Sequence, residues 1–332
     1  MRKLKMFFKS QLVFLMAAFP ALADKPVLTI YTYDSFISEW GPGPAIEKNF
    51  EAICGCDVNF VGLDSSLGIL GRLQLEGSSS KADIALGLDT NVMAVAQNTG
   101  LFAEHGLKSG ANMLPQPIED KVFLPFDWGY FAFVYDTTKM ANPPASLDAL
   151  ISSKEDIKIA IQDPRTSTPG LGLLLWMKSV YGEDAAAKWQ QLQPKILTVT
   201  KGWWDAYSLF LEGEADMVLS YTTSPAYHII AEGKNNYAAA DFAEGHYVQI
   251  EVAAMLKSAP QPELARQFLS FMHQQGFQSV IPTTNWMYPV TKSDLPEGFE
   301  GLVQPANSFL FTPDEVAKNQ KNWINEWVQS SK

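Results

Sequence analysis

The sequence predicts an α/β protein of two lobes, each a mostly parallel sheet flanked by helices, joined by two crossing strands. Three observations support this fold class. The chain has 332 residues, enough for about two domains. Short apolar runs alternate with segments of helical periodicity, which is typical of largely parallel sheets. One short pattern also occurs twice, as two lobes of similar design would require.

Residues 1–23 have the three parts of a secretory signal peptide. Four basic residues and no acids accompany the apolar stretch Leu12–Phe19, and Ala21-Leu-Ala23 matches a cleavage site. The apolar stretch is too short to span a bilayer. We therefore expect cleavage after Ala23, export of a soluble chain, and no stable membrane insertion.

The charge of the chain argues against one class of partner. The net charge is −11, and removing the four positive charges of the signal peptide takes it to −15. A nucleic-acid-binding protein would be basic, so we expect no nucleic-acid partner. An acidic surface is compatible with a cationic ligand, although it does not require one.

The first lobe begins with alternating strands and helices. Buried strands are expected at residues 27–33, 58–63 and 84–87. Ile46, Phe50 and Ile53 recur at helical spacing between the first two strands. Leu67–Glu76 reads as a helix before the third strand. It ends in Leu75-Glu-Gly77, and the related pattern Leu211-Glu-Gly213 precedes another apolar run.

Two long apolar runs are candidates for strands that cross between the lobes. Phe123–Tyr135 is rich in aromatic residues, and His246–Val252 follows it much later in the chain. Helices are predicted at residues 262–272 and 313–330. We therefore assign residues 24–126 and 253–332 to lobe 1 and residues 127–252 to lobe 2.

The stretch Asp163–Gly170 is rich in hydroxyl groups and lies between a predicted strand and a predicted helix. Ser167 or Thr168 could cap that helix, and Pro169 suits its first turn. The free N–H groups of a helix N-terminus favour an anion or a polar ligand atom. An ordinary strand-to-helix turn would have the same sequence features.

Polar residues follow most of the predicted strands. Ligands bind at the carboxyl ends of strands in open α/β sheets. Two facing lobes would bring these polar ends into one cleft. The polar candidates are Tyr33, Ser65, Ser66, Ser167, Thr168, Tyr221, Thr222, Thr223 and Ser224.

Two loop tryptophans add an aromatic component. Trp203 follows a short β-like run, and Trp286 lies between Pro282 and Pro289. Either side chain could stack on a ligand or pack within the protein. A cation over an indole face gains about 0.5–2 kcal/mol.

The sequence supplies no catalytic or metal-binding motif. It contains neither G-x-S-x-G nor H-E-x-x-H, and its four histidines are scattered. Cys54 and Cys56 are too close together for a typical zinc site, and they could form a disulfide or remain free thiols. We expect no catalytic residues, no metal site and no cofactor.

Several segments together resemble the periplasmic thiamine-binding proteins of ABC importers, which are type II solute-binding proteins. The resemblance spans the mature chain and is most specific along Asp163–Met177. The other segments that carry it are 27–44, 126–136, 198–203, 218–227 and 282–289. It implies a two-lobed fold that closes on thiamine, thiamine monophosphate or thiamine diphosphate. It also implies a periplasmic location and delivery of the ligand to an inner-membrane ABC permease.

The same resemblance assigns ligand contacts to positions of this chain. They are Ser65, Ser66, Ser167, Thr168, Trp203, Tyr221, Thr222, Thr223, Ser224, Tyr33 and Trp286. Two alternatives use a similar fold. One is a thiamine-degrading enzyme with a nucleophilic cysteine. The other is an iron-binding or polyamine-binding solute-binding protein; iron sites favour adjacent tyrosines, and polyamine sites favour several carboxylates.

Overall fold

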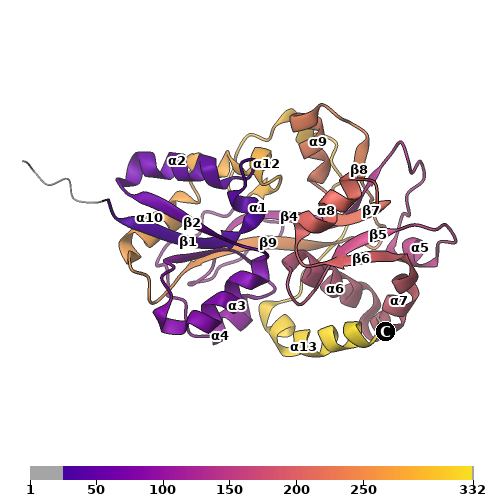
Figure 1. Ribbon diagram of the computed structural model, residues 1–332, viewed down its shortest axis with the longest axis horizontal. Coiled ribbons are helices and arrows are strands. Elements are labelled where there is room, and N and C mark those ends of the chain that lie inside the picture. Colours follow the sequence, from indigo (N-terminus) through magenta and orange to yellow (C-terminus); the bar gives the residue numbers. More distant parts are fainter. Residues whose placement is uncertain (1–24, 331–332) are drawn as a thin grey trace, which may run out of the picture.

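The computed structural model describes residues 25–330. The predicted signal peptide, residues 1–23, lies outside this range. Within the range, strands and helices alternate around one continuous, twisted sheet that runs through two halves of the molecule (Figure 1). We call the half built around β1, β2 and β3 the first lobe. The half built around β5, β6 and β7 is the second lobe.

The first lobe contains a three-strand parallel unit. β1 lies between β2 and β3 and is parallel to both. The helices α3 and α4 belong to one face, and α2 and α10 to the other, so apolar residues of the strands are buried on both sides. The elements of this lobe are β1 (Val27–Tyr33), α1 (Asp34–Ile37), α2 (Gly43–Cys54), β2 (Asp57–Leu63), α3 (Ser66–Glu76), β3 (Ile84–Asp89), α4 (Met93–Asn98), α10 (Pro262–Phe271), α11 (Gln275–Gln278), α12 (Ile281–Thr284) and β10 (Tyr288–Pro289).

The second lobe repeats this design. β5 lies between β6 and β7 and is parallel to both. The recurrent sequence pattern occupies equivalent places in the two lobes, because Gly77 follows α3 before β3 and Gly213 follows α8 before β7. The elements are α5 (Leu147–Ser152), β5 (Ile159–Gln162), α6 (Thr168–Tyr181), α7 (Ala185–Leu192), β6 (Ile196–Thr200), α8 (Trp203–Leu211), β7 (Met217–Tyr221), α9 (Ser224–Glu232) and β8 (Tyr237–Ala239).

Two long strands connect the lobes. β4 (Leu124–Asp136) pairs with β9 over its first half and with β7 and β8 over its second half. β9 (His246–Met255) pairs with both β3 and β4, and every residue in it is buried. Both strands run antiparallel to their main neighbours. The whole sheet is therefore mixed, whereas the unit inside each lobe is parallel as predicted.

The C-terminal helix α13 (Pro313–Ser330) lies under both lobes (Figure 1). It contacts α4 of the first lobe and α6 and α7 of the second. The half-buried Glu326 pairs with Lys178 of α6 at 2.7 Å. The short strand β11 (Ser308–Phe309) precedes α13 and pairs with β9. The limits of the two lobes, including the placement of α13 in lobe 1, remain a prediction.

The two cysteines form a disulfide at the end of α2. Cys54 and Cys56 are joined, and Gly55 between them has a φ of 64°. Of the two alternatives that the sequence left open, the structure has the disulfide. No helix between residues 25 and 330 combines the length and hydropathy needed to cross a membrane.

Close packing of α6 on β4 depends on Gly172. A Cβ atom at this position would lie 2.0 Å from Cε2 of Phe131 in β4. Gly71 is also inside a helix, α3, but a Cβ atom there would meet nothing within 4 Å. The two glycines are therefore a matched pair that differs only in packing.

We expect Gly172→Ala to lower the free energy of unfolding by about 1–3 kcal/mol, because the added methyl overfills the contact with Phe131. Gly71→Ala should raise it by about 0.5–1 kcal/mol through helix propensity alone. Urea unfolding of both variants measures the difference. Equal effects would show that α6 does not rest directly on β4.

Candidate functional site

A cavity of about 320 Å³ opens between the two lobes at the carboxyl ends of their strands. Its lining comes from both lobes, including α1, the loop after β2, the end of β7 and the first turns of α6, α8 and α9. Nine of the eleven residues expected at a ligand line it. They are Tyr33, Ser65, Ser66, Ser167, Thr168, Trp203, Tyr221, Ser224 and Trp286.

Thr222 and Thr223 do not line the cavity. Both side chains are fully buried, and their Oγ1 atoms have no hydrogen-bond partner among the described residues. The chain turns from β7 into α9 at these two positions, so their side chains enter the protein interior. Of the four residues 221–224 expected at the ligand, the middle two therefore have side chains outside the cavity lining, and their contact with a ligand remains a prediction.

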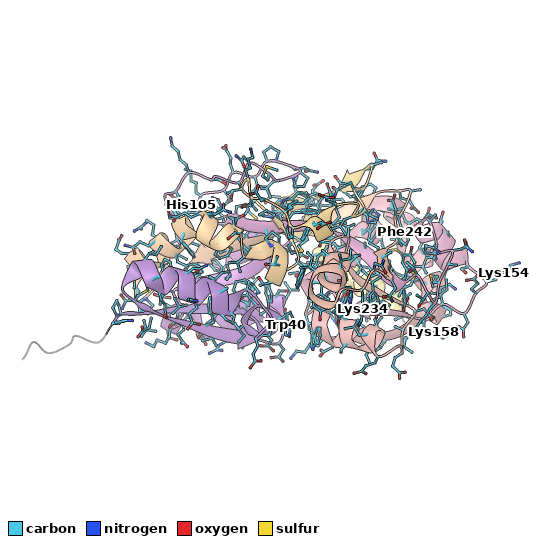
Figure 2. The ribbon with its side chains drawn as sticks, turned by 90° about the horizontal axis from the view of Figure 1, so that it is seen from above. Trp40, His105, Lys154, Lys158, Lys234 and Phe242 are labelled. Atoms are coloured by element: carbon cyan, nitrogen blue, oxygen red, sulfur yellow. A yellow bond between two sulfur atoms is a disulfide. The ribbon has the colours of Figure 1, made fainter. Side chains whose placement is uncertain are left out.

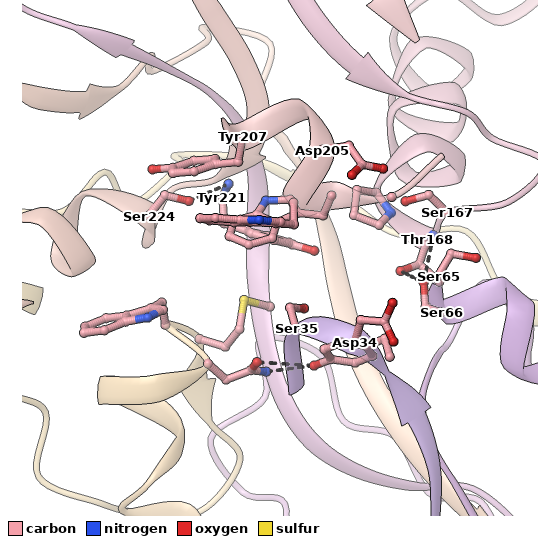
Figure 3. Close-up of a pocket in the computed structure, with 18 of the residues that line it drawn as sticks. Asp34, Ser35, Ser65, Ser66, Ser167, Thr168, Asp205, Tyr207, Tyr221 and Ser224 are labelled. Atoms are coloured by element: carbon pink, nitrogen blue, oxygen red, sulfur yellow. Dashed lines mark hydrogen bonds between the residues drawn. The ribbon is translucent and has the colours of Figure 1, made fainter. Parts of the chain in front are cut away.

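One end of the cavity is made of hydroxyl groups at two facing helix N-termini (Figure 3). Ser65 caps its own helix, α3, by accepting a hydrogen bond from the Gly68 N–H at 3.2 Å. Ser66 instead accepts a hydrogen bond from the Thr168 N–H of α6 at 3.1 Å. Its Oγ also shares a hydrogen bond of 2.8 Å with Thr168 Oγ1.

This geometry corrects the expected cap of α6. Ser167 occupies the N-cap position with extended backbone angles, but its side chain makes no capping bond. The hydroxyl that satisfies the first turn of α6 belongs to Ser66 of the opposite lobe. A residue 102 positions away in the chain supplies this bond, so local sequence could not reveal it. The hydroxyl of Ser167 is left for another partner.

The other end of the cavity is aromatic. Trp203 stacks on Tyr207 with ring centroids 4.9 Å apart, and its indole N–H donates to Ser220 Oγ at 2.8 Å. Tyr221 is held in turn by Phe131, with centroids 5.2 Å apart. These contacts fix the ring planes while leaving part of each ring facing the cavity. Trp203 is thus both packed and exposed to a ligand, so the two alternatives for it are compatible.

Trp286 is held in an unusual backbone conformation. Its φ is 56°, the only positive value at a non-glycine residue among residues 25–330. Such conformations are disfavoured and cluster at functional sites. The ring contacts Tyr227 edge-on at 5.3 Å and lines the cavity. A strained backbone position therefore carries one of the indoles in the cavity lining.

The floor of the cavity carries a hydrogen-bonded polar network. Tyr33 donates to Glu251 Oε2 at 2.9 Å, and Asn285 Nδ2 donates to Asp127 Oδ2 at 2.6 Å. Tyr33 fits here because Gly87, with a φ of 101°, has no Cβ to collide with its ring. Burial raises the pKa of Glu251 to about 7, and burial followed by the charge of Glu251 raises the pKa of Asp127 well above its usual range.

Direct contacts join the two lobes at the rim of the cavity. Trp40 of the first lobe packs on Trp204 of the second, with centroids 5.2 Å apart. Figure 2 shows Trp40 where the two halves meet. Asp64 and Lys201 form an ion pair across the same boundary. Together with the bond between Ser66 and Thr168, these contacts hold the two lobes around the cavity.

The family model for bacterial extracellular solute-binding proteins matches residues 38–276. The chain belongs to this family. It is 56% identical over 306 residues to the thiamine-binding periplasmic protein of Escherichia coli strain K12, covering 92% of this chain and 94% of the relative. Membership of this family also establishes the two-lobed binding-protein fold.

Two solved structures show how closely the fold is shared. A periplasmic thiamin binding protein superposes with a TM-score of 0.91 and 56% identity, covering 93% of this solute-binding protein and 97% of the other chain. Iron-bound HitA from Pseudomonas aeruginosa superposes with a TM-score of 0.75 at 20% identity, covering 92% and 100%. The second likeness concerns the fold alone.

Sequence analysis missed several residues that line the cavity of this solute-binding protein. Two of them are carboxylates, Asp205 and Glu251, and the carboxylates of Asp34 and Asp64 also line the cavity. Others are Trp40, Tyr207, Tyr227 and Asn285. One signal was available, since a glutamate inside the apolar run His246–Val252 must be buried and calls for a specific role.

The raised pKa of Glu251 makes a prediction about stability. In the unfolded chain a glutamate loses its proton near pH 4.5, whereas folded Glu251 keeps it to about pH 7. The folded state therefore binds more protons between these values, and stability falls as pH rises through them. The parent protein should lose about 1–3 kcal/mol of its free energy of unfolding across this pH range, and the Glu251→Gln variant should not.

Chemical unfolding of the ligand-free protein at several pH values measures this slope. The control is Glu212→Gln, which alters an exposed glutamate and should leave the slope as in the parent. A parent protein whose stability rises between about pH 5 and about pH 7, relative to Glu251→Gln, would contradict the burial of a protonated carboxyl.

Proposed function

We propose that this protein is the substrate-binding component of an ABC importer that binds thiamine and its mono- and diphosphate esters between its lobes. The main support is the cavity, which has aromatic rings at one end and hydroxyl groups at a helix N-terminus at the other. The highly similar relative and solved structure, both thiamine-binding by name, support the same ligand class.

The chemistry of thiamine matches the two ends. Its aminopyrimidine and cationic thiazolium are planar rings that suit Trp203, Tyr221 and Trp286 by stacking and cation–π attraction. Its hydroxyethyl tail, or a phosphate on it, suits the hydroxyls and N–H groups near Ser167 and Thr168. The carboxylates in the lining add attraction for a cation.

The signal-peptide pattern and the family both support the following setting for this function. The chain is exported through the signal peptide at residues 1–23, cleaved after Ala23, and works in the periplasm. It delivers its ligand to the inner-membrane permease of the importer. Residues 24–126 and 253–332 form lobe 1, residues 127–252 form lobe 2, and the lobes close on the ligand.

The protein binds its ligand without turnover. A thiamine-degrading enzyme of this fold would need a nucleophilic cysteine, and the two cysteines here are joined in a disulfide outside the cavity lining. The iron alternative has less support, because iron sites favour adjacent tyrosines and Tyr221 is followed by Thr222.

Titration calorimetry with the mature protein tests the function. Thiamine, its monophosphate and its diphosphate should each bind at a ratio of one to one and be recovered intact. Spermidine serves as the control ligand, because it is cationic but has no ring to stack. Spermidine binding in preference to thiamine would overturn the proposal in favour of a polyamine carrier.

The two ends of the cavity should respond differently to mutation. Trp203→Ala should weaken all three thiamine forms alike, by about 3- to 30-fold, because it removes ring stacking and a cation–π contact. Ser167→Ala combined with Thr168→Ala should weaken the phosphate esters more than free thiamine, by about tenfold or more, since charge-assisted hydrogen bonds contribute about 1.5–3 kcal/mol each.

Calorimetry of the parent and both variants with each ligand gives the comparison, and melting curves show whether the variants stay folded. Ser65→Ala is a matched control, because its hydroxyl already caps α3. It should affect the three ligands equally. A double variant that loses free thiamine and thiamine diphosphate by one common factor would contradict the assignment of the phosphate to α6.

A further inference from the structure

Three acidic residues lie side by side on adjacent strands beneath the cavity. Glu251 of β9 is the register partner of Asp89 in β3 and of Asp127 in β4. Their exposed fractions are 5%, 0% and 0%. None of the ion pairs within residues 25–330 involves any of the three. This row of buried acids therefore lacks the compensating cation that buried carboxylates normally require.

Only Glu251 of these three acids faces the cavity. Asp89 is occupied locally, because the side-chain amide and the backbone N–H of Asn91 each donate to it at 3.0 Å. Asp127 accepts a hydrogen bond from Asn285 on Oδ2, but its buried Oδ1 has no donor among the described residues. A proton on this oxygen would give Asp127 a hydrogen-bond donor beside Glu251, its register partner on β9.

Within residues 25–330, no side chain that faces Glu251 can supply a positive charge. From β1 it meets Tyr33, from β7 Tyr221, and from its own strand the amide of Gln249. Asn285, in the loop after α12, donates to the same oxygen as Tyr33 at 3.4 Å. From β3 and β4 it meets the acids Asp89 and Asp127. Both tyrosines resist ionisation, because burial raises their pKa values well above the usual range.

We propose that Glu251 is the counter-ion for the cationic part of the ligand and that binding releases its proton to the solvent. Asp127 keeps its own proton and uses it to donate a hydrogen bond to the ionised Glu251. The inference rests on the proposed function, because it assigns a partner to the positive charge of thiamine. It adds a specificity-determining residue that the hydroxyls and aromatic rings do not provide.

The charges balance in this arrangement. Below about pH 7, before binding, Glu251 and Asp127 are both protonated and this pair carries no charge. The ligand brings one permanent positive charge, and loss of the Glu251 proton leaves one negative charge beside it. A neutral ring of the same shape would gain nothing from this exchange. The cavity therefore selects the cationic ring over neutral analogues by charge as well as by stacking.

Titration calorimetry of free thiamine in buffers of different ionisation enthalpy counts the protons released. Close to one proton should leave per ligand near about pH 6, and almost none near about pH 8, where Glu251 is already ionised. Affinity should rise about tenfold per pH unit at the acidic end and level off above about pH 8. Free thiamine is used because a phosphate ester would itself titrate near pH 6; the protonation of the free ligand, measured separately, is subtracted.

Two variants locate the proton. Glu251→Gln keeps the shape of the side chain and should abolish both the proton release and the pH dependence of affinity. Asp34→Asn removes an exposed carboxylate from the same cavity and should release as many protons as the parent. Because the proton count of the parent protein is itself decisive, the test does not depend on the folding of Glu251→Gln.

The outcomes separate this inference from the proposed function. Thiamine that binds without releasing a proton near about pH 6, or proton release that persists in Glu251→Gln, would show that Glu251 is not the counter-ion, while the binding function stands. Absence of thiamine binding at both pH values would overturn the proposed function and this inference together.

Discussion

The pairing of β4 with β9 is the constraint on which the rest of this structure depends. The two strands are the central members of the sheet: β9 pairs with β3 of the first lobe, and β4 pairs with β7 and β8 of the second. β9 is buried along its whole length. Because these strands fix where the carboxyl ends of β1 and β7 face each other, they also fix the position and size of the cavity.

Contacts between the lobes fall into two groups with different strengths. Beneath the sheet, one apolar core continues from α3 and α4 through α6, α7 and α13. Around the cavity, the lobes meet through Trp40 on Trp204, one exposed ion pair, and a serine hydroxyl. Exposed ion pairs contribute little to stability. The contacts around the cavity are therefore fewer and weaker than those in the core beneath the sheet.

The sequence predicted the fold more completely than the site. Strands such as β1 and helices such as α13 are visible because apolar periodicity and turn residues are local signals. The helices α4 and α5 were not predicted, because each has only six residues and is too short to show a helical period. The antiparallel crossing of β4 and β9 is a tertiary property that no single segment encodes.

The site residues also differ in whether local sequence could identify them. Ser65, Ser167 and Tyr221 could be found because each ends a strand or starts a helix. The role of Ser66 as the cap of a distant helix could not be found, since the bond joins residues 102 positions apart. Thr222 and Thr223 were assigned to the ligand because a run of hydroxyls looks uniform in sequence. Burying them while exposing Tyr221 and Ser224 requires the turn between β7 and α9.

A buried acidic pair on the crossing strands is unfavourable for folding alone. An apolar pair of the same volume would pack in the floor of the cavity without desolvating any polar group, and such replacements are often neutral or stabilising. The present arrangement instead places Glu251 on the strand that reaches both lobes and opens its carboxyl toward the cavity. A charge that arrives with the ligand then acts where the lobes are joined. The strands β4 and β9 therefore both connect the lobes and carry the acids proposed to recognise the charge of the ligand.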